Sequence, residues 1–199
     1  MIIPASSIQH TNFSINCNGR LVDLNTPKIM GILNLTPDSF SDGGKFNNEK
    51  SALLQVEKML KDGADFIDIG AQSTRPNAEY LSAEEEIRRI GNMISLIKKE
   101  FPEALISIDT FYADVVKFGY NEGMDVVNDI SGGYFDENLL PTVAETKLPY
   151  ILMHSNTSYS TMHEKIHYED ITMSVNYYFS EKINQLQKLG IHDIILDPG

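Results

Sequence analysis

The sequence predicts an α/β protein built on a (β/α)8 TIM barrel, of which the first six β/α units are present. Six short apolar runs of the kind that form buried strands alternate with segments of helical periodicity. This alternation implies parallel strands joined by right-handed crossovers, which an open doubly wound sheet or a barrel would satisfy. Polar residues stand at the carboxyl ends of several different strands. That spread favours the barrel, because an open sheet gathers such residues at one switch point.

The amino-terminal part predicts a β-hairpin followed by the first barrel strand. Within residues 8–25, Asn18-Gly19 is a strong two-residue turn between alternating segments. We assign residues 1–27 to this hairpin segment, which could close one end of a larger core, and residues 28–199 to the barrel domain. Residues 27–34 are mostly apolar and lead into a dense set of turn residues at 36–44. The continuous apolar run indicates a strand buried on both faces.

The remaining elements follow in the order that a barrel requires. We expect helices at about 49–61, 82–100, 112–121, 137–146 and 174–189, and strands at 64–70, 105–110, 124–129, 150–154 and 194–199. Ser82-Ala83-Glu84-Glu85 has the form of a capping box and begins the second helix. The sixth strand comes at the end of the sequence, so we expect a barrel that is incomplete there. An open strand edge of this kind promotes self-association.

Composition narrows the class of protein. The chain has 199 residues, a net charge of −12 and a pI of about 4.7, which argues against a general affinity for nucleic acid. A local arginine or backbone amides can still bind an anionic small molecule. The single cysteine, Cys17, allows no internal disulfide. We see no signal peptide and no apolar run long enough to cross a membrane, so we expect a cytoplasmic protein without a membrane partner.

Each polar residue at a strand end has a structural explanation when taken alone. Asn34 could be satisfied by neighbouring backbone, and Asp109 could cap the following helix. Asn128-Asp129 and Asp197-Pro198-Gly199 could be ordinary turns. The sequence contains no dinucleotide fingerprint and no P-loop, so hydride transfer and nucleotide hydrolysis lose support.

Taken together, these residues predict a pocket for an anionic heterocycle. Several Asp and Asn side chains at one barrel mouth suit a ring rich in N–H donors, because a carboxylate accepts two parallel N–H bonds. Thr74-Arg75 would add anion binding. Asn34 would offer an oxygen to a hard cation such as Mg²⁺.

Five stretches resemble the dihydropteroate synthase family of the folate pathway. They stand in the family's order and at its strand ends, and the first is long and highly specific. The resemblance covers nearly the whole chain from about residue 10. The stretches are Gly31–Gly44 (GILNLTPDSFSDGG), Ser73–Pro76, Ser107–Thr110, Val127–Ile130 and Leu196–Gly199.

The resemblance implies an activity and a set of substrate contacts. The family condenses 6-hydroxymethyl-7,8-dihydropterin pyrophosphate with p-aminobenzoate and releases pyrophosphate with Mg²⁺ present. Carried over to this sequence, Asp109, Asn128 and Asp197 would hold the pterin ring. Thr74 and Arg75 would meet the pterin substrate and its departing pyrophosphate.

The same resemblance implies a metal ligand and a second substrate site. Asn34 would ligate Mg²⁺, and Asp42 would order the loop that follows the first strand. With Arg75 these residues would be catalytic, since Mg²⁺ and arginine neutralise the charge that develops on the leaving group. Phe40 and Pro76 would wall the p-aminobenzoate site. The family further implies a sulfonamide target and a homodimer in the full-length form.

The sequence also departs from the family's pattern. Before Ser-Thr-Arg-Pro the family has a glycine and an acidic residue, whereas this chain has Ala71 and Gln72. The family continues past Asp-Pro-Gly into a lysine loop, a Ser-Arg-Lys piece and an Arg-x-His, so we expect this chain alone to be inactive or nearly so. The alternatives are a pterin-dependent methyltransferase domain, which needs no pyrophosphate loop, and a non-catalytic pterin- or partner-binding fragment. Binding of pyrophosphate or p-aminobenzoate would separate them.

Overall fold

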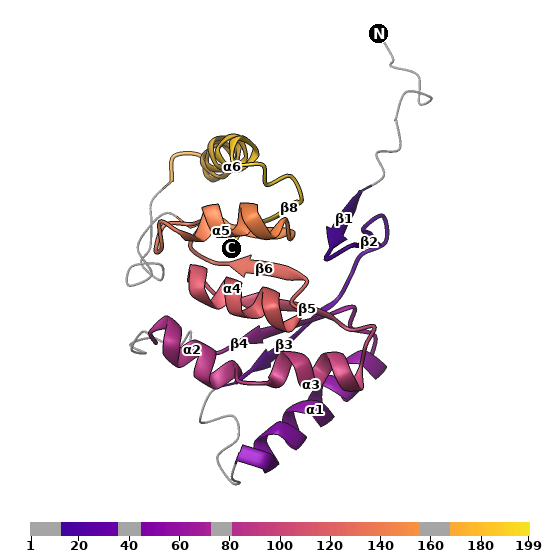
Figure 1. Ribbon diagram of the computed structural model, residues 1–199. Coiled ribbons are helices and arrows are strands. Elements are labelled where there is room, and N and C mark those ends of the chain that lie inside the picture. The colour runs from indigo at the N-terminus through magenta and orange to yellow at the C-terminus, as the bar shows by residue number, and fades with distance from the viewer. Residues whose placement is uncertain (1–12, 36–44, 73–80, 156–167) are drawn as a thin grey trace.

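One parallel sheet organises the computed structural model, which describes residues 13–35, 45–72, 81–155 and 168–199. Its spatial order follows the chain, and the helices lie on the side of the sheet away from the amino-terminal hairpin (Figure 1). The six strands are β3 (Met30–Asn34), β4 (Phe66–Gly70), β5 (Leu105–Asp109), β6 (Val126–Asp129), β7 (Tyr150–Met153) and β8 (Ile194–Asp197). The helices are α1 (Lys45–Lys61), α2 (Ala83–Ile90), α3 (Met93–Glu100), α4 (Ala113–Glu122), α5 (Leu139–Thr146) and α6 (Ile171–Lys188). The six predicted strands of a partial barrel are confirmed, and within the described residues helices follow the first five of them.

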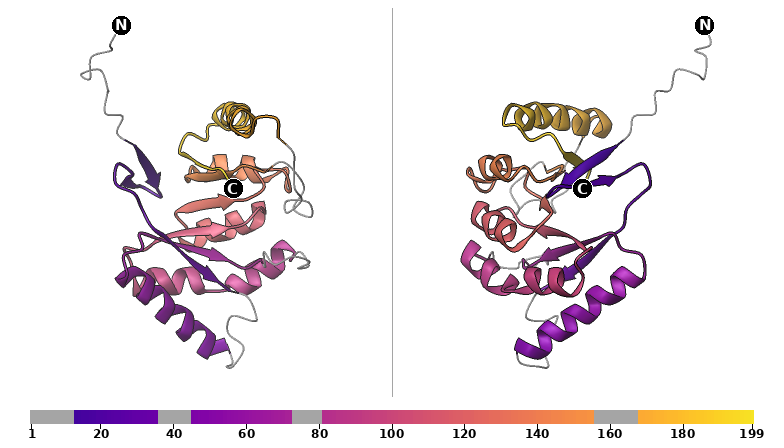
Figure 2. Two further views of the ribbon diagram at one scale, coloured as in Figure 1. Left: turned by 180° about the vertical axis from the view of Figure 1, so that it is seen from behind. Right: turned by 45° about the vertical axis from the view of Figure 1, so that its right-hand side comes forward.

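The predicted hairpin is present and lies at the amino ends of the barrel strands (Figure 2). Strands β1 (Ser14–Cys17) and β2 (Arg20–Asp23) pair antiparallel across a turn in which Asn18 has φ 51° and Gly19 has φ 89°. The hairpin is also held by the Asn16 N–H, which donates to Asp193 Oδ2 at 2.8 Å. A separate apolar cluster fills this end of the sheet, and its buried members are Ile15, Cys17, Val22, Phe66, Leu105, Val126 and Ile151.

The two faces of the sheet have different roles. The outer face packs against the helices through a continuous apolar core that includes Leu33, Ile67, Ile69, Ile106, Ile108, Val127 and Leu152. The inner face is open beside β3, where the Ile32 side chain is 61% exposed. The expectation that the first strand is buried on both faces is therefore wrong. β3 is an edge of the sheet in the described part of the chain. No described strand continues the barrel beyond β3 and curves over its inner face.

One helix boundary also differs from the sequence prediction. The segment 82–100 forms two helices, α2 and α3, because Gly91 adopts φ 52°, which lies outside the right-handed helical region. The interruption still lets Ile90 and Ile94 reach the same core. The Ser82 cap is confirmed, since its Oγ accepts the Glu85 N–H at 3.3 Å. Helix α1 begins at Lys45, earlier than the sequence indicated.

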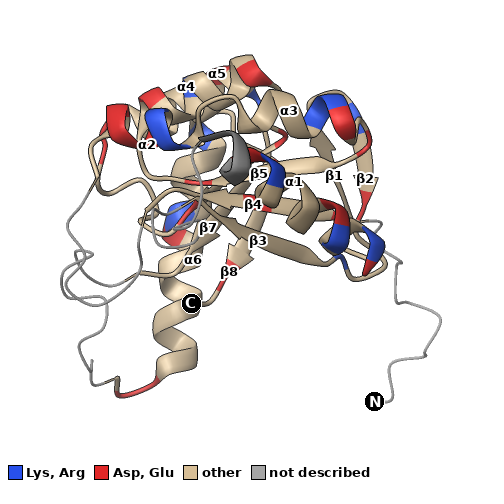
Figure 3. Cartoon of the chain, turned by 90° about the horizontal axis from the view of Figure 1, so that it is seen from below, with Lys and Arg blue, Asp and Glu red and all other residues tan. Residues whose placement is uncertain are grey.

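The described helices include none with the length and apolar character that crossing a membrane requires. Figure 3 shows that acidic and basic residues are distributed over the helices that surround the sheet.

The two edges of the sheet give the first prediction. Strands β3 and β8 each pair on one side only within the described residues, and unpaired edges recruit strands from other chains. We expect the purified chain to self-associate at micromolar concentration, with a sedimentation coefficient that rises with concentration. A monodisperse monomer that unfolds cooperatively would contradict this expectation.

Candidate functional site

Three polar side chains from three strands meet at the carboxyl edge of the sheet. The strand register pairs Asn34 with Gly70, Gly70 with Asp109, and Asp109 with Asn128. Gly70 leaves the space between the polar side chains open. A Cβ atom built on Gly70 would lie 3.2 Å from Asn34 Oδ1 and 3.7 Å from Asp109 Oδ2. The sequence prediction that Asn34, Asp109 and Asn128 gather at one mouth is therefore confirmed.

Asp109 has the most perturbed carboxyl of this group. Its pKa is raised to about 8, first by burial and then by the charges of Asp68, Glu86 and Asp129. It does not cap a helix, because the residue preceding α4 is Tyr112. Within the described residues no hydrogen bond is made to its carboxyl oxygens. A ligand that brings N–H donors to Asp109 would favour the ionised form.

A second layer of polar residues lies beneath Asp109, and sequence reasoning missed it. Asn128 Nδ2 donates to Asp68 Oδ2 at 3.1 Å, and Asp68 is only 6% exposed. Burial raises the pKa of Asp68, while the Ser107 and Asn128 side chains lower it. Asp68 Oδ1 and Ser107 Oγ nevertheless make no hydrogen bond of standard geometry. A charged residue inside the apolar run 66–69 was the available signal, because such burial is costly unless it serves a site.

Asn128 and Asp129 are adjacent at the end of β6, and the structure gives them different roles. Adjacent residues of a strand point to opposite faces, so Asn128 joins the site while Asp129 points toward the helices. The buried Asp129 carboxylate accepts the Ser131 N–H at 2.6 Å, the Gly133 N–H at 2.7 Å and the Tyr150 hydroxyl at 2.5 Å. Burial raises the pKa of Asp129 against the effect of these bonds. Asp129 therefore shapes the turn after β6.

Asp197 lies at the same edge of the sheet, at the end of β8. It pairs with Met153 in the register of β7 and β8, and its carbonyl accepts the His154 N–H at 2.7 Å. Asp197 Oδ1 accepts the Gly199 N–H at 2.9 Å, which is the turn geometry that the Asp-Pro-Gly sequence suggested. The half-buried His154 ring packs against Tyr178 on α6, with ring centroids 4.9 Å apart.

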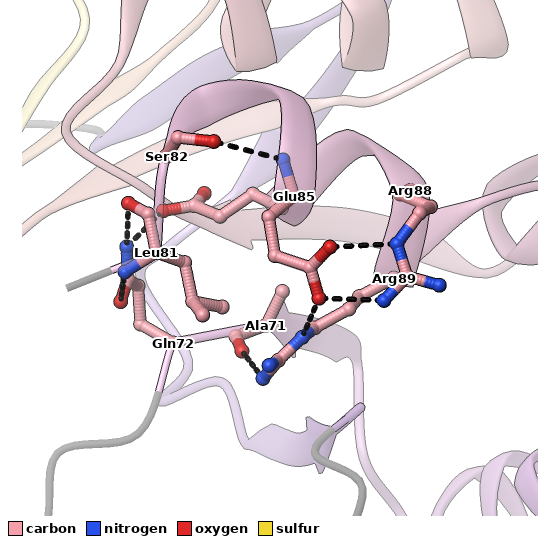
Figure 4. A network of polar contacts seen from close by, with 8 residues as sticks. Ala71, Gln72, Leu81, Ser82, Glu85, Arg88 and Arg89 are labelled. Carbon is pink, nitrogen blue, oxygen red and sulfur yellow. Dashed lines mark hydrogen bonds and ion pairs between the residues drawn. The ribbon is translucent and has the colours of Figure 1, made fainter. Parts of the chain in front are cut away.

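The carboxyl end of β4 is fastened to α2 by a polar network (Figure 4). Glu85 binds Arg88 at 2.6 Å and Arg89 at 2.9 Å, and Arg89 Nη1 donates to the Ala71 carbonyl at 3.3 Å. Gln72 bonds to Leu81 in the same network. These contacts connect the strand end beside Gly70 to the helix that follows it.

Five residues that the resemblance assigns to the site lie outside the described residues. They are Phe40, Asp42, Thr74, Arg75 and Pro76. Their roles stay predictions.

Asn34 is compatible with the expected Mg²⁺. Within the described residues no group of three His, Cys, Asp or Glu side chains could enclose a metal. Mg²⁺ keeps several waters and usually takes one or two protein oxygens together with substrate phosphates. The Asn34 amide oxygen, next to Gly70 at the mouth, fits that pattern as a single protein ligand.

Gly70 provides a test of this geometry. We expect Gly70→Ala to weaken binding of the pterin that the family resemblance implies by about tenfold while the chain stays folded, because the new methyl group occupies space between Asn34 and Asp109. Calorimetric titration measures the affinity, and thermal unfolding measures the stability. The control change Ser51→Ala, at an exposed position of α1, is expected to leave binding unchanged. Equal binding by wild type and Gly70→Ala would exclude Gly70 from the ligand site.

Comparison with known proteins identifies the family of the chain. The family described as pterin binding enzyme matches residues 30–199. The chain is 42% identical over 177 residues to a folate synthesis bifunctional protein of Arabidopsis thaliana, covering 86% of this chain and 37% of that protein. It is 40% identical over 183 residues to the dihydropteroate synthase of Escherichia coli, covering 91% of this chain and 64% of the relative.

The solved structures agree with the expected fold. Yersinia pestis dihydropteroate synthase, determined with a sulfonamide drug complex, superposes with a TM-score of 0.83 and 36% identity over 94% of this chain and 68% of that one. A Xanthomonas albilineans dihydropteroate synthase with 4-aminobenzoic acid gives a TM-score of 0.84 and 33% identity over 95% of this chain and 67% of that one. The chain spans about a third of the length of the plant bifunctional proteins and about two thirds of the bacterial synthases. The chain belongs to the pterin-binding enzyme family, on its dihydropteroate synthase branch.

Proposed function

We propose that this chain forms the pterin-binding part of a dihydropteroate synthase. The reaction would join 6-hydroxymethyl-7,8-dihydropterin pyrophosphate to p-aminobenzoate and release pyrophosphate. The observation that carries the proposal is that Asn34, Asp109 and Asn128 stand together at the carboxyl edge of the sheet, with Gly70 between Asn34 and Asp109. Such an edge is where barrel enzymes bind their substrates.

The described residues supply recognition rather than a nucleophile. An ionised Asp109 would accept two N–H bonds from the amino-pyrimidine edge of the pterin. Asn128, oriented by its bond to Asp68, would contribute an amide, and Asp197 would approach from β8. The p-aminobenzoate amine attacks the exocyclic methylene carbon, a C–N bond forms, the C–O bond to pyrophosphate breaks, and the amine loses a proton. No covalent bond to a side chain is needed.

Further parts of the proposal rest on the family resemblance. Mg²⁺, held by Asn34 and substrate phosphate oxygens, would supply charge neutralisation at the leaving group. Thr74 and Arg75 would bind the pyrophosphate, and Asp42 would order the loop after β3. Phe40 and Pro76 would wall the p-aminobenzoate site. The full-length protein would be a cytoplasmic homodimer.

Calorimetric titration with chosen ligands tests the function. We expect the chain to bind the dihydropterin pyrophosphate with Mg²⁺, and to bind pyrophosphate or p-aminobenzoate as well. Binding of a methylated tetrahydropterin, without binding of pyrophosphate or p-aminobenzoate, would instead indicate a methyltransferase-type domain. Failure to bind any pterin would contradict the proposal that these strand ends form the pocket.

A further inference from the structure

Gln72 connects two points of the chain that flank residues 73–80. Its Nε2 donates to the Leu81 carbonyl at 3.2 Å, and its Oε1 accepts the Leu81 N–H at 3.2 Å. The side-chain amide therefore pairs with the Leu81 backbone as a neighbouring strand would (Figure 4). The flanked segment includes Thr74 and Arg75 in the sequence.

The same amide also connects to a buried carboxyl. Gln72 Nε2 donates to Glu86 Oε1 at 2.5 Å, and the Glu86 side chain has no exposed surface. The other oxygen of Glu86 accepts the Thr110 hydroxyl at 2.9 Å. Thr110 directly follows Asp109, so the chain of bonds runs from the end of β4 through α2 to the end of β5.

The contacts of the Gln72 side chain in this chain match the donors and the acceptor of a primary amide. Two acceptors, the Leu81 carbonyl and the Glu86 carboxylate, face Nε2 of the side chain. The Leu81 N–H faces Oε1. A primary amide has two N–H donors and one accepting oxygen, which matches this arrangement. An ionised carboxylate at the same place would only accept, so it would leave two acceptors without a donor and place a second negative charge beside Glu86.

The surroundings of Glu86 determine the pH at which its carboxyl ionises. Burial raises the pKa of Glu86 to about 6, against the lowering effect of Gln72, Thr110 and the Arg89 charge. The charge of Glu86 in turn raises the pKa of Asp109, at the end of β5. At neutral pH Glu86 is therefore mostly an anion that depends on its two donors.

We propose that Gln72 is a positioning residue of the pterin site, whose amide holds Leu81 and Glu86 and, through Thr110, fixes the strand end that carries Asp109. This proposal rests on the proposed function, because the effect of Gln72 is measured as a change in pterin affinity. Gln72 itself does not touch the reacting atoms. It sets the positions from which the binding residues act.

The change Gln72→Glu turns this role into a pH-dependent one. At low pH the variant's carboxyl shares a proton with Glu86 and can still donate, whereas at high pH both groups ionise and repel. We expect the dissociation constant for the dihydropterin pyrophosphate, divided by that of wild type, to stay near one at pH 6. The ratio should rise to about ten or more at pH 8.5.

The matched control is Gln55→Glu, which makes the same charge change at an exposed position of α1. Its ratio is expected to stay near one at every pH. A ratio for Gln72→Glu that does not change with pH would overturn the proposal. Thermal unfolding at both pH values separates weaker binding from loss of the fold.

A ligand-free measurement keeps the two proposals distinguishable. In Gln72→Ala, the Leu81 amide loses its acceptor, so its hydrogen exchange should become at least about tenfold faster than in wild type. Unchanged exchange at Leu81 would overturn the positioning role. A wild-type chain that binds no pterin would contradict the proposed function, and the exchange of Leu81 would still decide whether Gln72 holds this connection.

Discussion

Asp109→Asn is expected to weaken binding of the dihydropterin pyrophosphate by about a hundredfold or more. The substitution removes the negative charge and turns one acceptor into an N–H donor that faces the donors of the pterin. Calorimetric titration at pH 8.5 with Mg²⁺ measures the loss. Asp114→Asn, at an exposed position of α4, removes the same charge away from the site and should bind as wild type does. Equal affinities of wild type and Asp109→Asn would exclude Asp109 from pterin recognition.

The same residue predicts the pH dependence of binding. The pKa of Asp109 is about 8 in the ligand-free chain, and the ligand prefers the ionised form. Below pH 8 binding must first remove the proton, so the affinity should fall about tenfold for each pH unit. Above pH 8 the affinity should reach a plateau.

Titrations between pH 6.5 and 9 test this slope. The range stays above the pKa of Glu86, about 6, so that Glu86 changes charge little. Asp109→Asn should abolish the slope together with most of the affinity. A wild-type affinity that is constant over this range would show that the Asp109 proton is not linked to binding.

Asp129→Ala is expected to lower the free energy of unfolding by about 4 kcal/mol. The buried carboxylate accepts two backbone N–H groups and the Tyr150 hydroxyl, and its removal leaves all three donors unpaired. Stabilities of single domains are about 5–15 kcal/mol, so this change would remove a large part of the total. Urea unfolding followed by circular dichroism measures the difference.

Tyr150→Phe separates the contributions within this cluster. It removes only the hydroxyl donor, and we expect a loss of about 1 kcal/mol. Glu145→Ala, at an exposed position of α5, serves as the control and should leave the unfolding midpoint unchanged. If Asp129→Ala cost no more than Tyr150→Phe, the bonds to the Ser131 and Gly133 amides would contribute nothing to the stability.

The sequence located much of the candidate site because a simple rule connects it to the fold. In a parallel sheet the carboxyl ends of all strands meet at one edge, so Asn34, Asp109 and Asn128 had to approach one another once the strands were identified. The rule could not separate Asn128 from Asp129. Those neighbours point to opposite faces, and the packing of the helices decides which face is outside.

Other features depended on contacts between distant segments. Gln72 and Glu86 are fourteen residues apart in the chain, and Glu86 also bonds to Thr110 on another strand. Asp68 becomes part of the site through Asn128, sixty residues away. The charged Asp68 inside an apolar run was a local signal of a site, but no local pattern identifies the distant partner in any of these pairings.

Periodicity and turn residues therefore determined the order of the strands and helices, the hairpin at Asn18-Gly19 and the edge at which the ligand would bind. These are local properties, set by how side chains repeat along a strand or a helix. The division of α2 from α3 at Gly91, the exposure of Ile32 and the raised pKa of Asp109 were decided by the tertiary structure. Burial and the field of neighbouring charges depend on what surrounds a residue in space, and that information is absent from its immediate neighbours in the chain.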